Sequence, residues 1–416
     1  MVAGQGQEWQ RVACGLTART VPIDDPGDLL SLLPVPAALA WVRGGEGLVG
    51  WGEAAQVELP AGVDRFAAGE KWLQAVFAAA DVEDQVGLPG CGLVAFGSFT
   101  FDPASDGSVL VIPRAVAGRR GGQAWLTMIG DGPGPFARVQ PVTGPAEVRW
   151  HDGSLTAPAW QRAVAAAVAR IRAGELRKVV LARDLHASAS APFDVRALLA
   201  RLAARHPDCY TFSCAGLAGA TPELLIRREG RRIESLVLAG TAPRGSTPGQ
   251  DRARGDELLA SAKDAEEHRY AVESVREVLA PRCARLGVAP EPALLRLADV
   301  QHLATPVSGT LAAGTSALAL AAALHPTAAV CGTPTETALE LIRELEGMDR
   351  SRYAGPVGWL DASGNGEWGI ALRCGELDGT RARLFAGCGI VAGSDPAAEL
   401  AEAQAKFRPM RFALEG

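Results

Sequence analysis

The sequence predicts a single α+β unit whose first part is rich in strands, and three observations support this. Four apolar residues recur at helical spacing before a glycine, as in an amphipathic helix and its end: Trp160, Val164, Val168 and Ile171, then Gly174. Short apolar runs between glycines and prolines, such as residues 92–101, indicate strands early in the chain. No repeat or long linker divides the sequence, so we expect residues 1–150 and residues 151–416 to be parts of one fold.

The middle of the chain carries further strand and helix signals. Lys178 stands directly before an apolar run that is typical of a buried strand. Residues 195–206 repeat the amphipathic helical pattern. The segment "ELLIRREGRRIESLVL" predicts two strands that turn at Glu229 and Gly230 as a hairpin.

The last third alternates helices and strands. Residues from about 256 to 286 are expected to be helical. The segment "TETALELIRELE" predicts a helix with Thr335 or Thr337 as its cap. "EWGIALRC" and "ARLFAGCGIV" are typical of neighbouring strands, and Pro396 fits the first turn of a final helix.

Composition and charge exclude several classes of protein. The chain has 416 residues with a formal net charge of -6, which argues against a nucleic-acid partner because phosphate binding favours a basic surface. No uninterrupted apolar stretch reaches the ~18 residues that a membrane span needs, and the first residues do not resemble a secretory signal. The eight cysteines form no CxxC pair, so we expect reduced thiols and a cytoplasmic protein without a membrane partner.

Carboxylates on two predicted helices are candidate metal ligands. Glu266 and Glu267 adjoin a histidine on one helix, while Glu399 and Glu402 lie one turn apart on another, with Lys406 on the same face. Each group taken alone is more typical of a solvated helix with ion pairs. If the two helices face each other, their carboxylates would suit Mg²⁺, which prefers oxygen ligands.

Two charged residues at the mouths of predicted strands are candidates for acid–base chemistry. Glu223 opens the apolar run "LLI", and burial there would raise its pKa toward that of a general acid. Burial would also lower the pKa of Lys178 and make its amine a base. Either residue could instead be a surface charge that caps a strand. His302 and His325 rank below these carboxylates as candidates, because a core histidine or a turn histidine explains them equally well.

Glycine-bounded segments and one arginine are candidates for anion binding. "LAGTAPRG" and "FAGCGIV" could bring backbone N–H groups close to an anion, although ordinary turns use the same residues. Arg373 lies in the apolar segment "GIALRC", where a guanidinium needs a planar anionic partner such as a carboxylate. That partner could equally be a structural Asp or Glu.

Taken together and in order, these segments resemble the chorismate-utilising enzymes. The matching blocks are "RKVVLAR", "TPELLIRREG", "LAGTAPRG", "SAKDAEEH", "VQHLATPVSGTL", "LHPTAAVCGTP", "RYAGPVGWLDASGNGEWGIALRC", "LFAGCGIVAGSDPAAEL" and "AEAQAKF". The family includes isochorismate synthase, salicylate synthase, anthranilate synthase component I and aminodeoxychorismate synthase component I. The resemblance implies an anthranilate synthase component I-like α+β fold, with two packed β-sheets, helices outside and the active site between the sheets. It covers residues from about Trp160 onward, and residues 1–150 fit the family's variable N-terminal part only in general character.

Two positions favour the water-using branch of this family. Ammonia-using anthranilate synthases typically carry glutamine where this chain has Lys178, and aminodeoxychorismate synthases typically carry lysine at the position of Ala239. The resemblance therefore implies an isochorismate synthase without a glutamine amidotransferase subunit. We expect a monomer that acts on chorismate in menaquinone or siderophore biosynthesis.

The resemblance also implies a role for each residue. Lys178 would deprotonate the water that attacks C2 of chorismate, and Glu223 would protonate the departing C4 hydroxyl. Mg²⁺ would be held by Glu267 and Glu402, with Glu399 assisting through water. The implied substrate-binding residues are Gly240, Thr241, His302, Tyr353, Arg373, Gly387 and Lys406.

Two alternatives remain open at the level of sequence. Salicylate synthase shares the lysine and the metal-binding glutamates but goes on to eliminate pyruvate, and pocket residues such as Ala329 and Val330 would separate the two. A non-catalytic chorismate-binding protein is the alternative from another class. The presence of Lys178, Glu223, Glu267 and Glu402 argues against it.

Overall fold

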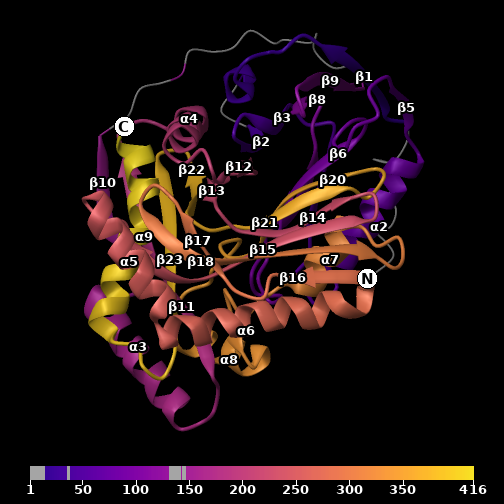
Figure 1. Cartoon of the computed structure of the whole chain (residues 1–416). Coiled ribbons are helices and arrows are strands. Elements are labelled where there is room, and N and C mark those ends of the chain that lie inside the picture. The colour runs from indigo at the N-terminus through magenta and orange to yellow at the C-terminus, as the bar shows by residue number, and fades with distance from the viewer. Residues whose placement is uncertain (1–14, 35–37, 131–141, 143–146) are drawn as a thin grey trace, which may run out of the picture.

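Two large β-sheets form the body of the computed structural model, which describes residues 15–34, 38–130, 142 and 147–416. Helices cover the outer faces of the sheets (Figure 1). Described strands pair antiparallel throughout, except for one parallel pair at the edge of the larger sheet. The predicted α+β class, with two packed sheets and helices outside, is confirmed.

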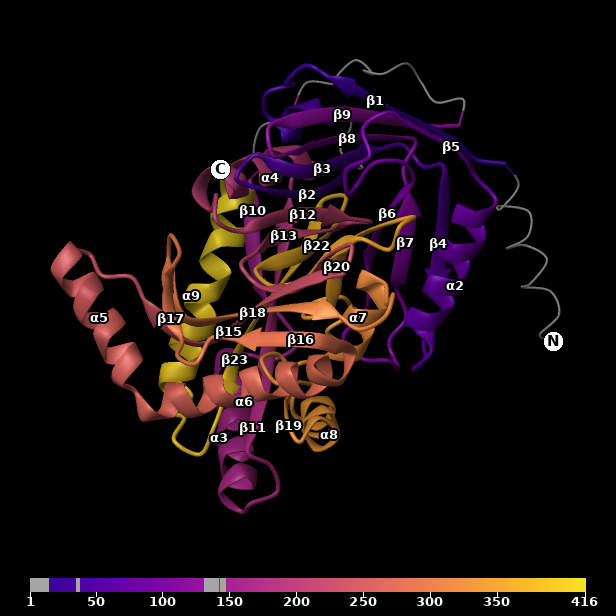
Figure 2. The ribbon, with the colours of Figure 1, turned by 45° about the vertical axis from the view of Figure 1, so that its right-hand side comes forward.

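The larger sheet has thirteen strands, and Figure 2 shows part of their order, which runs from bottom to top in that view. In spatial order they are β10 (Val148–Asp152), β11 (Lys178–Ala189), β23 (Arg381–Ile390), β22 (Cys374–Asp378), β13 (Leu217–Thr221), β12 (Tyr210–Cys214), β2 (Leu39–Arg43), β3 (Glu46–Trp51), β8 (Ala115–Arg120), β9 (Gln123–Ile129), β1 (Thr17–Ile23) and β5 (Asp81–Asp84), with β19 (Gly332–Thr333) paired to β11.

The smaller sheet has ten strands. In spatial order they are β16 (Cys283–Val288), β18 (Val300–Leu311), β15 (Arg232–Pro243), β14 (Leu224–Glu229), β21 (Gly366–Ile370), β20 (Pro356–Asp361), β6 (Val94–Ser98), β7 (Ser108–Ile112) and β4 (Ala55–Leu59), with β17 (Ala293–Arg296) paired to β18. The predicted hairpin at Glu229 and Gly230 is confirmed as β14 and β15.

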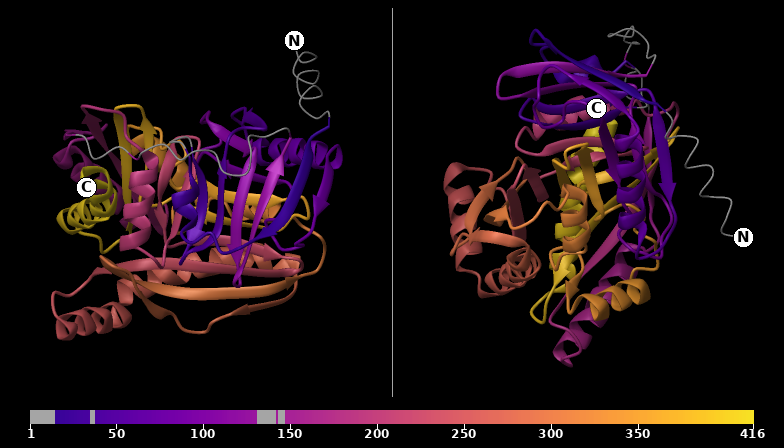
Figure 3. Two further views of the ribbon diagram at one scale, coloured as in Figure 1. Left: turned by 90° about the horizontal axis from the view of Figure 1, so that it is seen from above. Right: turned by 90° about the vertical axis from the view of Figure 1, so that its right-hand side faces the viewer.

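Both sheets mix strands from the two ends of the chain. In the larger sheet β2 pairs with β12, and in the smaller sheet β6 pairs with β20. The early strands, indigo to violet, gather on one side of the molecule in Figure 3. There they form one end of each sheet, next to strands from later in the chain.

Eight α-helices are described outside or at the ends of the sheets. They are α2 (Arg65–Ala78), α3 (Ala157–Arg172), α4 (Val195–Arg205), α5 (Pro248–Ala260), α6 (Ala262–Leu279), α7 (Ala317–Leu324), α8 (Thr335–Leu345) and α9 (Pro396–Glu415). Two short 3₁₀ turns, η1 (Leu29–Leu32) and η2 (Ala280–Arg282), are also described. α9 packs against β23 and α3, and α6 packs against β15. No helix among the described residues is both long and apolar enough to cross a membrane.

The hydrophobic core has two parts. One part lies between the sheets, where Trp41 of β2 is buried and its indole Nε1 donates to Glu367 of β21 over 3.0 Å. The other lies under α4 and α9, where Leu199 and Met410 pack over the outer face of the larger sheet. The seven described cysteines form no disulfide.

Three local predictions are wrong. The segment 256–286 is not one helix, because Ser261 ends α5 and caps α6 with its hydroxyl, and strand β16 begins at Cys283. Neither Thr335 nor Thr337 caps α8; the cap position is Pro334, which makes no side-chain hydrogen bond. "EWGIALRC" is not one strand either, since it leaves the smaller sheet at Ile370 and enters the larger sheet at Cys374.

Candidate active site

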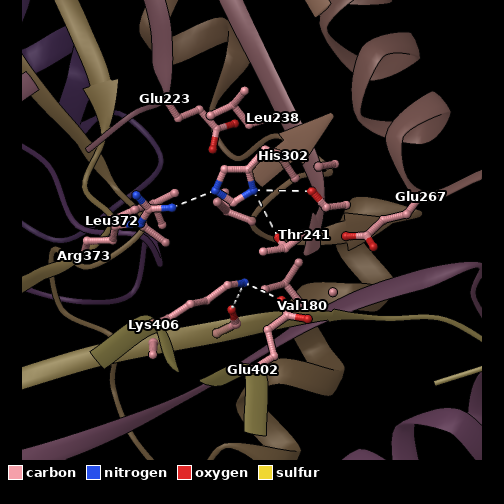
Figure 4. A pocket seen from close by; sticks show the side chains of 18 of the residues that line it. Val180, Glu223, Leu238, Thr241, Glu267, His302, Leu372, Arg373, Glu402 and Lys406 are labelled. Carbon is pink, nitrogen blue, oxygen red and sulfur yellow. Dashed lines mark hydrogen bonds and ion pairs between the residues drawn. The ribbon is translucent and has the colours of Figure 1, made fainter. Parts of the chain in front are cut away.

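Two neighbouring crossings between the sheets position an acid and a cation. The chain passes from β13 to β14 at residues 222–223 and from β21 to β22 at residues 371–373. The crossings are hydrogen-bonded to each other, from Ile370 N to Glu223 O over 3.2 Å and from Ala220 N to Arg373 O over 3.2 Å. Glu223 and Arg373 therefore lie at the seam between the sheets, and both line one pocket (Figure 4).

The backbone of Arg373 adopts a left-handed conformation. Its φ is +47°, a region that non-glycine residues rarely occupy. Residues held in such conformations are often found at functional sites, because the surrounding structure must stabilise them. Here the turn sends the chain from one sheet to the other and places the guanidinium in the pocket.

His302 of β18 fixes the direction of that guanidinium. Arg373 Nη2 lies 2.7 Å from His302 Nε2, and since a guanidinium can only donate, Nε2 must accept. The ring proton is then on Nδ1, which lies 3.3 Å from the carbonyl of Gly240 and 3.1 Å from Thr241 Oγ1. Burial and the nearby Arg373 hold the pKa of His302 well below its usual value, in agreement with a neutral ring.

Burial raises the pKa of the Glu223 carboxyl to about 8, although the positive charge of Lys178 opposes this shift. Glu223 is only 5% exposed. A carboxyl in such surroundings keeps its proton at neutral pH and can act as a proton donor.

Lys178 lies at the first position of β11 and is fully buried. Its Nζ lies 3.1 Å from Oε1 of Glu267, which comes from α6. Lys178 is not among the residues that line the pocket, but Glu267 is, so the carboxylate separates the amine from the cavity. Gly389 of β23 leaves the space for this pair, because a Cβ there would stand 2.1 Å from Glu267 Oε1.

The last helix brings two carboxylates to the same pocket. Oxygens of Glu399 and Glu402 on α9 lie within 4.8 Å of each other and of the Cys388 thiol. Burial and the neighbouring Glu402 raise the pKa of Glu399. Burial also raises the pKa of the Cys388 thiol well above its ordinary value, so this neutral sulfur is a poor ligand for a hard cation.

Each candidate metal-binding glutamate has a lysine partner. Besides the Lys178–Glu267 pair, Lys263 Nζ lies 3.0 Å from Glu399 Oε1, and Lys406 Nζ lies 2.8 Å from Glu402 Oε1. Glu399 and Glu402, with oxygens within 4.8 Å of each other, and Glu267 in the same pocket offer carboxylate oxygens, the ligands that Mg²⁺ favours. The residues present therefore fit this cation.

The remaining predicted residues of the pocket include Lys406, Tyr353 and Gly387. Lys406 Nζ donates to the carbonyl of Gly387 over 2.8 Å. The Tyr353 ring stacks on Phe385 with centroids 5.1 Å apart, and a Cβ at Gly387 would stand 3.1 Å from the Tyr353 hydroxyl. A side chain at position 387 would therefore crowd the Tyr353 hydroxyl, and glycine avoids this contact.

Eleven of the twelve predicted site residues line this pocket, and the twelfth, Lys178, adjoins it through Glu267. The sequence interpretation missed Lys263 and Asp264, which also line it. Both lie one turn before Glu267 on α6, so the helical spacing of "SAKDAEE" could have identified them.

Comparisons with known proteins identify relatives of the whole fold. The family described as chorismate binding enzyme matches residues 140–415. Isochorismate synthase DhbC of Bacillus subtilis is 38% identical over 328 residues, which span 71% of this chain and 82% of that protein.

Solved structures agree with this relationship. The menaquinone-specific isochorismate synthase MenF of Escherichia coli superposes with a TM-score of 0.80 at 26% identity and covers 98% of both chains. Anthranilate synthase component I of Streptococcus pneumoniae superposes with a TM-score of 0.70 at 20% identity, covering 89% of this chain and 92% of that one. The second likeness concerns the fold alone, and it confirms the predicted fold class.

Proposed function

We propose that this chain, which belongs to the family of chorismate binding enzymes, is an isochorismate synthase that converts chorismate to isochorismate. Its relatives with that printed name support the reaction. The observation that carries the proposal is the buried Lys178 beside Glu267, together with Glu223, a carboxyl of the pocket whose pKa is raised to about 8.

The two residues have complementary parts in the proposed reaction. Lys178, as the free amine, removes a proton from water while the oxygen bonds to C2 of chorismate. The ring double bond shifts, and the C4–oxygen bond breaks. Glu223 gives its proton to the departing hydroxyl, which leaves as water. One water is consumed and one is released, so the net reaction is an isomerisation.

Charged groups of the pocket would bind the substrate's two carboxylates. Arg373, held by His302, presents a guanidinium fork, and Tyr353 and the N–H of Gly387 belong to the same pocket and are further candidates for binding the enolpyruvyl carboxylate. Glu267, Glu399 and Glu402 would hold Mg²⁺ near the ring carboxylate. Bound there, the cation would neutralise negative charge and orient the substrate.

The test is a product analysis of the purified protein with chorismate and Mg²⁺, without ammonia, separated by chromatography. We expect isochorismate from the wild type and from Lys71→Ala, a control at an exposed lysine. Lys178→Ala should lose about 100-fold to 10,000-fold in rate, the usual contribution of a general base.

The products decide between the alternatives. Salicylate together with pyruvate would reassign the chain to salicylate synthase. Bound but unchanged chorismate would make it a binding protein. If Lys178→Ala turns chorismate over at the rate of the wild type, Lys178 is not the general base.

A further inference from the structure

A second cavity lies on the opposite face of β11 from the candidate active site. Its volume is about 570 Å³, and residues of β10, β11, α3 and α9 line it. Side chains alternate between the faces of a strand, so Val180, which lines the active-site pocket, and Arg183, which lines this cavity, point to opposite sides. The cavity is large enough for a small organic ligand.

Arg183 is the unusual residue of this cavity. Its side chain belongs to a residue only 5% exposed, and no hydrogen bond or ion pair within the described part of the chain reaches its guanidinium. Burial lowers its pKa, since the charged form loses solvation, although the negative charges of Asp152 and Asp184 oppose this shift. Leaving a buried charge without a partner is costly, so such a group indicates a missing anion.

The nearest acidic residues do not meet this need. Asp184 is engaged on the other face, where its carboxylate accepts from Ser154 N over 2.6 Å and pairs with Arg383 over 2.9 Å. Asp152, on the adjacent strand β10, lines the cavity but is exposed and makes no ion pair among the described residues.

The other walls add positive charge and apolar surface. Arg408 and Arg411 of α9 line the cavity, and Arg411 is matched by Glu415 at 3.5 Å. Over the whole lining, three arginines stand against Asp152 and Glu415, which leaves one excess positive charge. The apolar walls are Leu185, Phe407 and Phe412.

We propose that this cavity binds a small aromatic carboxylate, with the carboxylate on the fork of Arg183 and the ring against the phenylalanines of α9. A guanidinium and a carboxylate can form two parallel hydrogen bonds, and an excess of one positive charge suits a monoanion. Aromatic side chains favour a flat apolar body over a bare inorganic anion.

The test is isothermal titration of the full chain with benzoate, with neutral benzamide and inorganic phosphate as comparison probes. Lys406→Met removes a cation of the first pocket and so reports whether benzoate binds there instead. Arg183→Met should weaken benzoate binding at least tenfold, the loss of a charge-assisted contact worth about 1.4 kcal/mol or more. Arg149→Met, at an arginine with a 73% exposed side chain, is the matched control.

Support requires benzoate binding that survives in Lys406→Met and Arg149→Met and weakens in Arg183→Met. Benzamide and phosphate should bind at least tenfold more weakly than benzoate. Arg408→Gln, at an exposed position, should weaken benzoate binding severalfold and keeps the test valid if Arg183→Met does not fold. The proposal is overturned if benzoate does not bind at millimolar concentration, if only Lys406→Met loses binding, or if phosphate binds as well as benzoate.

Discussion

Lys178 and Glu267 form a buried ion pair at the wall of the pocket, with Nζ 3.1 Å from Oε1. The lysine comes from the first position of β11 and the glutamate from α6, so the ion pair joins two segments that lie far apart in the sequence. An ammonium held in this way cannot accept a proton. The free amine that the proposed mechanism requires forms only when this ammonium loses its proton, and Glu267 is also one of the residues that would hold Mg²⁺.

The space around this pair gives a first prediction. Gly389→Ala should place its Cβ against Glu267 Oε1 and displace the carboxylate, because the added atom would stand 2.1 Å from that oxygen. We expect turnover of chorismate to fall at least 100-fold while the circular dichroism spectrum is kept. Gly393→Ala is the matched control, since a Cβ there meets no atom within 4 Å. Equal activity of the two variants would contradict the proposed role of the pair.

A second prediction concerns the pH dependence of Glu223. A proton donor works only while it is protonated, and the pKa of this carboxyl is raised to about 8, so kcat should fall as pH rises through about 8. Glu223→Gln should lose most activity at every pH. Exposed Glu58→Gln serves as the control and should keep the profile of the wild type. A wild-type rate that is flat from pH 6 to 10 would exclude Glu223 as the acid.

The second prediction extends to stability, because the same pKa shift also changes the free energy of unfolding. The folded pKa of Glu223 lies above the ordinary value of 4.5, so between pH 4.5 and about 8 the folded chain binds more protons than the unfolded chain. Its contribution to the free energy of unfolding is therefore largest below pH 4.5 and is lost as pH rises through about 8. Glu223→Gln should gain stability relative to the wild type between pH 5 and pH 9, measured by guanidinium unfolding. A constant difference would show that the carboxyl is ionised in the folded protein.

The lysine partners of the carboxylates give a third prediction. Lys263 lies 3.0 Å from Glu399 and should compete with a cation for that oxygen. Removing an ion pair worth about 1 kcal/mol should strengthen Mg²⁺ binding about fivefold in Lys263→Met, measured by titration without substrate. Lys71→Met, at an exposed lysine, should not change it. Weaker Mg²⁺ binding in Lys263→Met would mean that the lysine holds the carboxylate in its binding position.

A fourth prediction tests how His302 positions Arg373. His302→Phe removes the acceptor that lies 2.7 Å from Arg373 Nη2, so the guanidinium loses its orientation. We expect KM for chorismate to rise about tenfold with a smaller change in kcat, since one charge-assisted contact is worth roughly that factor. His302→Gln supplies another acceptor and should restore part of the loss, and exposed His151→Phe is the control. A fall in kcat alone would point to a chemical role for the histidine.

Local patterns in the sequence were sufficient for many of the elements. The 3.6-residue period predicted α3 and α4, and the turn at Glu229 and Gly230 predicted the hairpin. Glu399 and Glu402 were placed on one helix face by their spacing. These predictions succeeded because the interactions that define them lie within a few residues along the chain.

The failures lie where a local pattern met a tertiary constraint. "EWGIALRC" looks continuous because both sheets bury apolar residues, and the sequence does not mark the change of sheet at residues 371–373. In the sequence Ser261 is an ordinary polar residue within a helical pattern. In the structure its hydroxyl caps α6, so one helix ends and another begins there. Nothing in the sequence distinguishes Arg183 from other arginines in strands. Its burial and its lack of a hydrogen-bond partner at Nε are visible only in the folded chain.

By itself, the sequence determined the class of fold, most elements and, through its resemblance to a known family, the residues expected in the pocket. Only the tertiary structure decided how these residues meet: Lys178 behind Glu267, and Glu223 beside Arg373 on paired crossings between the sheets. The physical reason is that contacts between remote segments depend on strand order and packing, which leave no periodic signal in the residues that make them.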